Sequence, residues 1–127
     1  MKKETKQWIE IAEDDIDMMR IAMDKRKYAY AVLFAQQAVE KIIKAYIIEH
    51  GKRQPRKIHA LEELLKDTKL DLKETKNLNI KDLSKAYARV RYPDLSGKYY
   101  ESARDVKDLL VTAEKIYVWI KQKLAES

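Results

Sequence analysis

The sequence predicts an all-α protein, an up-and-down bundle of four or five helices. The 127 residues include only two glycines and two prolines, whereas an all-β chain of this length needs many turns. Apolar residues make up 46% and charged residues 38%, a balance typical of a helical bundle. The length suits one domain with a real core and is too short for two of ordinary size. We therefore expect a single helical domain over residues 1–127.

Two long helices are expected first. Residues 5–24 carry an apolar side chain every three or four positions, from Trp8 to Met23, which is the spacing of an amphipathic helix. Residues 28–50 keep this spacing and are apolar around much of the circumference, so this second helix is expected to be the central one. Small residues that allow a neighbouring helix to come close recur seven apart, at Ala31, Ala38 and Ala45.

The middle of the chain is more broken. Gly51 is a natural end for the second helix, and Pro55 prevents a regular element in the basic connection KRQPRK. A short third helix is expected from Ile58 to Lys66. Residues 67–79 are polar and predict a loop that can hold one turn of helix.

The last two expected helices flank a second break. Apolar residues from Ile80 to Val90 predict a fourth helix, which ends near Arg91 because Pro93 disfavours helical geometry in the residue before it. A fifth helix is expected from about Lys98 and has the cleanest repeat in the chain. Its apolar residues are Ala103, Val106, Leu110, Ala113, Tyr117, Ile120 and Leu124.

The excess of positive charge lies in the second part of the chain. Residues 1–50 hold nine basic and nine acidic side chains, whereas residues 51–127 hold eighteen basic and twelve acidic ones, which accounts for the net charge of +6. Such an excess favours a phosphate-bearing or acidic partner. A composition rich in Lys and Glu is also typical of heat-adapted proteins that bind no such ligand. Both interpretations remain open at this point.

Several classes of protein are excluded or disfavoured. The absence of cysteine excludes disulfides and thiolate metal sites and allows a reducing compartment, so we expect a cytoplasmic protein. The first twenty residues contain no continuous apolar segment and are not a signal peptide. The longest apolar run, residues 28–35, is far too short to span a bilayer. We therefore expect a soluble protein without a membrane partner.

No metal or cofactor site is expected. Four carboxylates share one face of the first helix and offer ligands for Mg²⁺, but that face is opposite Trp8 and is most simply the solvated side. These acids are Glu10, Glu13, Asp14 and Asp17. The two histidines lie nine apart without cysteine, which disfavours zinc. No glycine-rich phosphate loop is present.

The stretch RVRYPDLSGKYY, residues 89–100, has two possible interpretations. Cations at the end of a helix complement its dipole, so Arg89 and Arg91 are compatible with a simple helix end. Guanidinium groups gathered with phenols are also the groups that contact phosphates and bases. Two guanidinium groups, three phenols and one ammonium group come together here, from Arg91, Tyr92, Lys98, Tyr99, Tyr100 and Arg104.

Polar residues line one side of the second helix, at Gln36, Gln37, Glu40, Lys41 and Lys44. Glu40 and Lys44 have the favourable order four residues apart. This set is either a solvated ladder of ion pairs or, on a central helix, a buried network whose members pair with one another or with a partner.

Four stretches together resemble the HEPN domain, a small helical domain named for its higher-eukaryote and prokaryote nucleotide-binding members. They are YAVLFAQQAVEKIIKAYIIEHG, HALEELL, RYPD and EKIYVWIKQKL. The opening stretch WIEIAEDDIDMMRIAM is also similar to the start of the family, so the resemblance covers nearly the whole chain. It implies an up-and-down helical bundle that usually forms a homodimer, with a groove between the protomers.

The resemblance also implies classes of function. Many similar members are encoded beside a minimal nucleotidyltransferase and act with it as a two-component module, often of the toxin and antitoxin type. Another branch consists of metal-independent ribonucleases, which place an arginine and a histidine four to six residues apart in the dimer groove. Here no histidine follows Arg91, so the catalytic pair has no match at the expected place. Arg53 and His59 have the right spacing but lie in the loop before the third helix, and we treat this match as a coincidence.

The resulting prediction is a binding module without catalytic residues, a homodimer that pairs with a minimal nucleotidyltransferase and contacts nucleotide or RNA in the groove between its protomers. The residues expected to bind the nucleotide or its phosphate are Arg91, Tyr92, Lys98 and Arg89. The residues expected in an interface or polar network are Gln37, Glu40, Lys41, His59 and Asp94. Two alternatives remain open: a metal-independent ribonuclease, and a purely structural partner that binds no nucleic acid.

Overall fold

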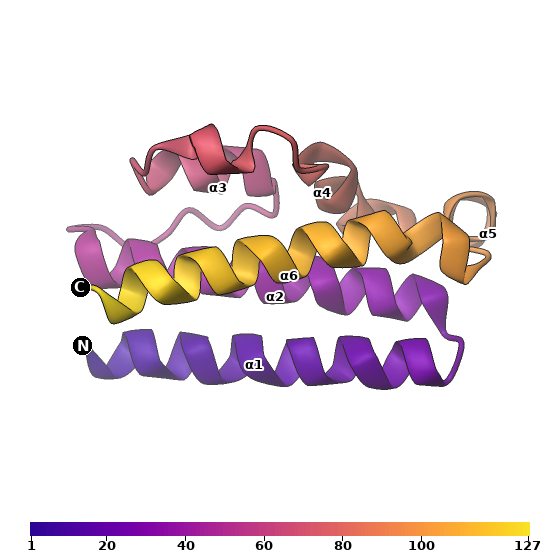
Figure 1. Cartoon of the computed structure of the whole chain (residues 1–127), viewed down its shortest axis with the longest axis horizontal. Coiled ribbons are helices and arrows are strands. Elements are labelled where there is room, and N and C mark those ends of the chain that lie inside the picture. Colours follow the sequence, from indigo (N-terminus) through magenta and orange to yellow (C-terminus); the bar gives the residue numbers. More distant parts are fainter.

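The computed structural model describes residues 1–127 and contains only helices, which confirms the all-α prediction (Figure 1). There are six α-helices rather than four or five, together with one short 3₁₀ helix. Their bounds are α1 Lys3–Asp24, α2 Tyr28–His50, α3 Leu61–Asp67, η1 Leu72–Thr75, α4 Ile80–Arg89, α5 Pro93–Tyr99 and α6 Ala103–Ala125. None of the helices is both long and apolar enough to span a membrane.

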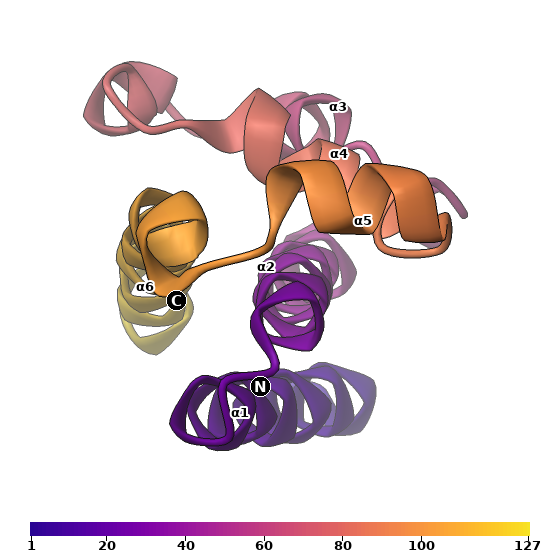
Figure 2. The ribbon, with the colours of Figure 1, turned by 90° about the vertical axis from the view of Figure 1, so that its right-hand side faces the viewer.

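The three long helices pack side by side, with α1 antiparallel to both α2 and α6 (Figures 1 and 2). At one end of the molecule the backbone N–H of Lys2 donates to Glu49, near the end of α2. At the same end, His50 Nε2 and Ser127 Oγ lie 2.7 Å apart, so α2 and α6 run in the same direction. The segment from α3 to α5 connects the end of α2 to the start of α6, which lies at the opposite end of the molecule.

The core is centred on α2, as expected from its apolar circumference. Figure 2 shows α2 between α1 on one side and the α3 to α5 layer on the other, with α6 beside it. Thirteen of its 23 residues are buried. Ala31, Ala38 and Ala45 are fully buried, which fits the close approach of neighbouring helices that small side chains allow.

Two boundaries in the second half differ from the prediction. Pro93 does not simply end a helix: it is the first residue of α5, where its missing N–H and restricted φ are favourable. The closing helix α6 begins at Ala103 rather than near Lys98. Ser102 and Asp105 form a capping box there, which satisfies free backbone N–H groups at this end of the helix.

The third helix begins at Leu61 rather than at Ile58. Side chains from α2 and α4, instead of helical hydrogen bonds, satisfy backbone groups of His59 and Leu61. Gln36 Nε2 donates to the His59 carbonyl over 3.1 Å. The backbone N–H of Leu61 donates to Ser84 Oγ over 2.8 Å. The connection before α3 is therefore held between α2 and α4 in a non-helical conformation.

One side of α1 and α2 is covered by no other helix (Figure 2). On α1, the pairs Glu13–Lys121 and Arg20–Glu114 mark the side toward α6. The opposite side, which we call the open face, carries exposed apolar residues beside the Asp15–Lys41 ion pair. Its residues are Ile11 (45% exposed), Met18 (41%) and Tyr30 (57%), with the partly buried Phe34 and Gln37 one and two turns beyond Tyr30.

Candidate phosphate-binding site at the end of α4

Three side chains are stacked at the end of α4. The rings of His59 and Tyr87 lie 3.6 Å apart, centre to centre, and their planes differ by 15°. The central carbon of the Arg91 guanidinium lies 3.9 Å from the centre of the same Tyr87 ring. Two groups cannot share one face of a ring at these distances, so His59 and Arg91 lie on opposite faces of Tyr87. The Arg91 cation is favourably placed over the π-face of the ring.

A buried carboxylate orients His59 from behind. Glu40 of α2 is 8% exposed, and its Oε1 lies 2.9 Å from His59 Nδ1. An ionised carboxylate only accepts hydrogen bonds, so Nδ1 donates and, in the neutral ring, Nε2 keeps a lone pair. The His59 side chain is 42% exposed. The ring is thus held in one orientation while remaining accessible to a ligand.

Glu40 is the centre of a buried polar network. Lys44 Nζ donates to Glu40 Oε2 over 3.0 Å, and Gln36 Nε2 donates to Glu40 Oε1 over 3.2 Å. The side chains of Lys44 and Glu40 are only 9% and 10% exposed. The ammonium of Lys44 also lies 6.0 Å from the centre of the Trp8 ring of α1. Of the two interpretations of the polar side of α2, the buried network therefore describes these residues.

The other two polar residues of α2, Gln37 and Lys41, lie outside this network. Lys41 Nζ is 2.6 Å from Asp15 Oδ2, so it joins α2 to α1 and not to Glu40. Gln37 is partly buried on the open face and makes no hydrogen bond within the chain. Only Glu40 and His59 of the expected network residues are thus in direct contact.

Arg89 and Arg91 occupy different surroundings although they are two residues apart. The Arg89 guanidinium stacks on Tyr99 at 3.7 Å, so it packs α4 against the end of α5. The Tyr100 hydroxyl is buried without a hydrogen-bond partner. Burial raises the pKa of the Tyr100 phenol, and the charge of the nearby Arg89 opposes part of that shift. Arg89 is thus engaged inside the protein, whereas Arg91 is exposed.

The remaining residues of the RYPD region are exposed. Tyr92 is 57% exposed and precedes the first residue of α5. Asp94 lies in the first turn of α5 and forms no ion pair. Lys98 is also exposed, with its ammonium 5.4 Å from the centre of the Tyr99 ring. Arg91 and Tyr92 thus form an exposed pair, with Lys98 two turns away along the chain.

Sequence reasoning missed the role of Tyr87. The residue looked like one more apolar position of the fourth helix, but its ring separates His59 from Arg91. The available signal was that Tyr87 and Arg91 are four residues apart at a helix end, a spacing at which side chains meet. No comparable signal links either of them to His59.

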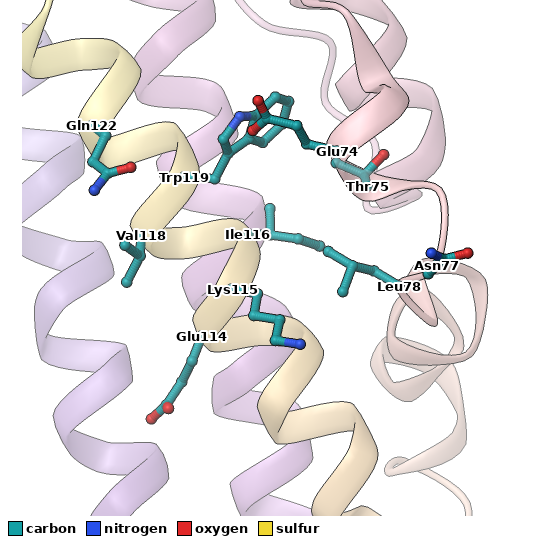
Figure 3. A pocket seen from close by; sticks show the side chains of 10 residues that line it. All are labelled: Glu74, Thr75, Asn77, Leu78, Glu114, Lys115, Ile116, Val118, Trp119 and Gln122. Carbon is teal, nitrogen blue, oxygen red and sulfur yellow. The ribbon is translucent and has the colours of Figure 1, made fainter.

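Two hollows lie on the surface near α4 and α6. The smaller, of about 430 Å³, adjoins the stacked residues and is lined in part by His59, Ser84 and Tyr87. The larger, of about 630 Å³, lies between the η1 segment and α6 and holds none of the predicted site residues (Figure 3). Trp119 lines the larger hollow, and its indole N–H is buried without an acceptor. Of the predicted site residues, His59 alone lines the smaller hollow, and Arg91 and Tyr92 line neither.

No three His, Asp or Glu side chains are grouped so as to hold a metal ion. Glu13 of the acidic face of α1 pairs with Lys121 at 2.7 Å. Arg53 is exposed and forms no hydrogen bond or ion pair with its side chain, although Arg53 and His59 have the spacing of the ribonuclease motif. Arg91 packs on the same Tyr87 ring as His59, but on its other face.

Comparisons with known proteins agree with this fold. The family model of the HEPN domain matches residues 5–123. The chain belongs to the HEPN family. Its fold is similar to the crystal structure of TT1696 from Thermus thermophilus, with 25% identity, a TM-score of 0.78, and coverage of 96% of this chain and 99% of that one. It is also similar to ST0689, described as an archaeal HEPN homologue, with 25% identity, a TM-score of 0.73, and coverage of 97% and 98%. No curated protein matches the chain.

We predict that the Glu40 carboxylate stabilises this HEPN domain as well as orienting His59. Glu40→Ala leaves the Lys44 ammonium buried without a partner, so we expect a loss of about 3–5 kcal/mol in the free energy of unfolding. The double variant Glu40→Gln/Lys44→Met removes both charges and is expected to lose much less. Urea denaturation measures both, with Glu126→Ala at an exposed position as the control. Equal losses in the single and the double variant would contradict a stabilising ion pair.

Proposed function

We propose that this HEPN protein is a non-catalytic binding module that contacts nucleotide or RNA through Arg91 and Tyr92. The observation that carries the proposal is the state of Arg91: its guanidinium is exposed, has no carboxylate partner, and is kept on the Tyr87 ring. A planar cation held in this way is well suited to two parallel hydrogen bonds with a phosphate. The neighbouring Tyr92 offers an exposed ring on which a base can stack.

Lys98 and Arg89 have supporting roles in this proposal. Lys98 is a flexible, exposed cation on α5 and adds positive charge beside the site. Arg89 stacks on Tyr99 and thereby orders the segment that carries Tyr92. The contact with the ligand is therefore assigned chiefly to Arg91 and Tyr92.

We propose further that the protein is a homodimer that pairs through its open face. Ile11 and Met18 of α1 and Tyr30 of α2 are exposed apolar side chains spread along the open face, and no helix covers this side. Apolar patches of this kind are favourable to bury against a second copy. The partner expected from the resemblance is a minimal nucleotidyltransferase, with which this chain would form a two-component module of the toxin and antitoxin type.

A metal-independent ribonuclease is the second candidate function, and one observation favours it. His59 is oriented by Glu40 through Nδ1, which leaves Nε2 to accept a proton, and Arg91 lies on the other side of the Tyr87 ring. In such a reaction the RNA 2′-oxygen attacks the phosphorus, the P–O5′ bond breaks, and His59 takes the 2′-hydroxyl proton. Arg91 would stabilise the charge on the phosphoryl oxygens. A proton for the departing 5′-oxygen would have to come from water or from His59 once protonated.

The homodimer is tested by placing a charge on the open face. Met18→Asp buries a carboxylate in the proposed interface, so we expect the molar mass in solution to fall from that of a dimer to that of a monomer. Val111→Asp is the matched control because Val111 is equally exposed, at 42% against 41%, but lies on α6. Light scattering after gel filtration measures the molar mass. A monomeric wild-type protein, or a dimer that only Val111→Asp dissociates, would contradict this interface.

The ligand contact is tested by Arg91→Ala. Loss of a charged hydrogen-bonding group on a phosphate costs about 1.5–3 kcal/mol, so affinity for single-stranded RNA should fall about tenfold or more. The helical signal and melting temperature should change little, because the exposed Arg91 side chain stacks on the Tyr87 ring and forms no hydrogen bond or ion pair. Fluorescence anisotropy of end-labelled RNA at constant salt measures affinity, with Arg53→Ala as a control at an equally unpaired arginine. Equal affinity of Arg91→Ala and wild type would reject the role of Arg91.

The choice between binding and cleavage is tested with labelled RNA in excess chelator on a denaturing gel. A binding module leaves the RNA intact with the wild type and with every variant. A ribonuclease of the second kind cleaves it without metal, and His59→Ala and Arg91→Ala each abolish cleavage while Arg53→Ala does not. Products that end in a 2′,3′-cyclic phosphate would identify attack by the 2′-oxygen.

A further inference from the structure

The smaller hollow continues the Arg91 site along the length of α4. One wall is formed by His59, Ala60 and Glu62, which precede or begin α3. The other wall is α4 itself, through Lys81, Ser84, Lys85, Tyr87 and Ala88. Tyr87 belongs both to this hollow and to the stack with Arg91. The Tyr87 ring thus stands between the hollow, on its His59 side, and the Arg91 guanidinium on its other face.

The cations of this surface form a row. The three cations are Lys81, Lys85 and Arg91, and Ala88 lies between the last two. The intervals are four, three and three residues, so these positions lie along one side of α4 and its final turn. At a rise of about 1.5 Å per residue, Lys81 and Arg91 are about 15 Å apart along the helix axis. Ala88 has no side chain beyond Cβ and leaves the middle of the row open. Each strand of a duplex has a phosphate about every 3.4 Å, and an unstacked single strand spaces its phosphates more widely, so about two or three phosphate intervals, which a tetranucleotide supplies, cover this length.

Positive charge dominates the row. Lys81 and Arg91 have no acidic partner. Lys85 lies 3.7 Å from Asp82, but both side chains are about half exposed, and ion pairs of this kind contribute little. Glu62 is the one acid that lines the hollow, and its Oε1 accepts a hydrogen bond from Ser84 Oγ over 3.3 Å. Two lysines and Arg91 are thus available to an anion, against one carboxylate that is already hydrogen-bonded.

We propose that this surface binds a single-stranded RNA segment of about four nucleotides, with its phosphates running from Arg91 past Lys85 to Lys81. The inference rests on the proposed contact at Arg91 and extends it: a mononucleotide reaches only one cation of the row, whereas an oligonucleotide reaches all three. Tyr92 stacks a base at the Arg91 end, where its ring is exposed. Lys81 and Lys85 are therefore binding residues that contact the backbone without reading sequence.

The test compares uridine 5′-monophosphate with uridine oligomers of two, four and six nucleotides, titrated at several salt concentrations between about 50 and 200 mM. Affinity is expected to rise up to the tetranucleotide. Each phosphate contact contributes about −0.7 to the slope of log affinity against log salt for a single strand, so Lys81→Ala should reduce the steepness for the tetranucleotide by about 0.7 and the double variant Lys81→Ala/Lys85→Ala by about 1.4. Binding of the monophosphate should not change, and Lys81→Arg should restore the slope.

Lys6→Ala is the matched control, because Lys6 is exposed and unpaired on α1, which lies on the far side of α2 from α4 (Figure 2). Equal affinities for the monophosphate and the tetranucleotide, or equal slopes for Lys81→Ala and Lys6→Ala, would overturn the row while leaving the Arg91 contact intact. Failure of every uridine ligand to bind the wild type would instead overturn the proposed function. An oligoglutamate peptide that binds with the same dependence on Lys81 would assign the row to an acidic protein partner and overturn the RNA assignment.

Discussion

The site depends on the burial of one carboxylate. Charge at Glu40 is costly to remove from water unless hydrogen-bond donors surround it, and here three different side chains donate to it. Two of them, Gln36 and Lys44, lie one turn away on α2, which supplies local donors on either side. The third is His59, from a connection that is otherwise irregular. Satisfying Glu40 therefore brings a loop against the central helix, and the position of the His59 ring, of Tyr87 on it and of Arg91 beyond follows from that contact.

Backbone hydrogen bonds strengthen the same arrangement. The carbonyl of His59 accepts from Gln36, and the N–H of Leu61 donates to Ser84 of α4. A connection with no helical hydrogen bonds of its own is thus held from both sides by side chains of regular helices, which satisfies groups that burial would otherwise leave unpaired. Sites supported in this way keep their geometry because α2 and α4 are themselves fixed by the core. The exposed side chains of His59 and Arg91 are consequently held in a fixed arrangement.

The sequence predicted the long helices better than the site, for a physical reason. Periodic apolar residues identify α1, α2 and α6, because a helix that buries one face must repeat every three or four positions. The same reasoning missed α5. A proline can end one helix or begin another, and Pro93 alone does not show which of these occurs. Lys41 illustrates a further limit: it shares α2 with Glu40 but pairs with Asp15 of α1, because periodicity gives the side of a helix and not its neighbour. The stack of His59, Tyr87 and Arg91 joins a loop to a helix end, and no local pattern specifies such a contact.

The sequence allowed two explanations of the RVRYPD stretch, a simple helix end and a binding site, and its two arginines differ in which of them they fit. Side chains two apart at a helix end point to different sides, so Arg89 and Arg91 meet different aromatic rings. Arg89 packs on Tyr99 and belongs to the scaffold that joins α4 to α5. Arg91 packs on Tyr87, is exposed, and has no acidic partner within the chain. Cations that only complement the dipole of a helix end do not require an aromatic ring beside them, whereas both arginines here pack on one. The ring on which each arginine packs therefore distinguishes a structural guanidinium, that of Arg89, from an exposed one, that of Arg91. The exposed Arg91 guanidinium is the stronger reason to regard the end of α4 as a candidate binding site.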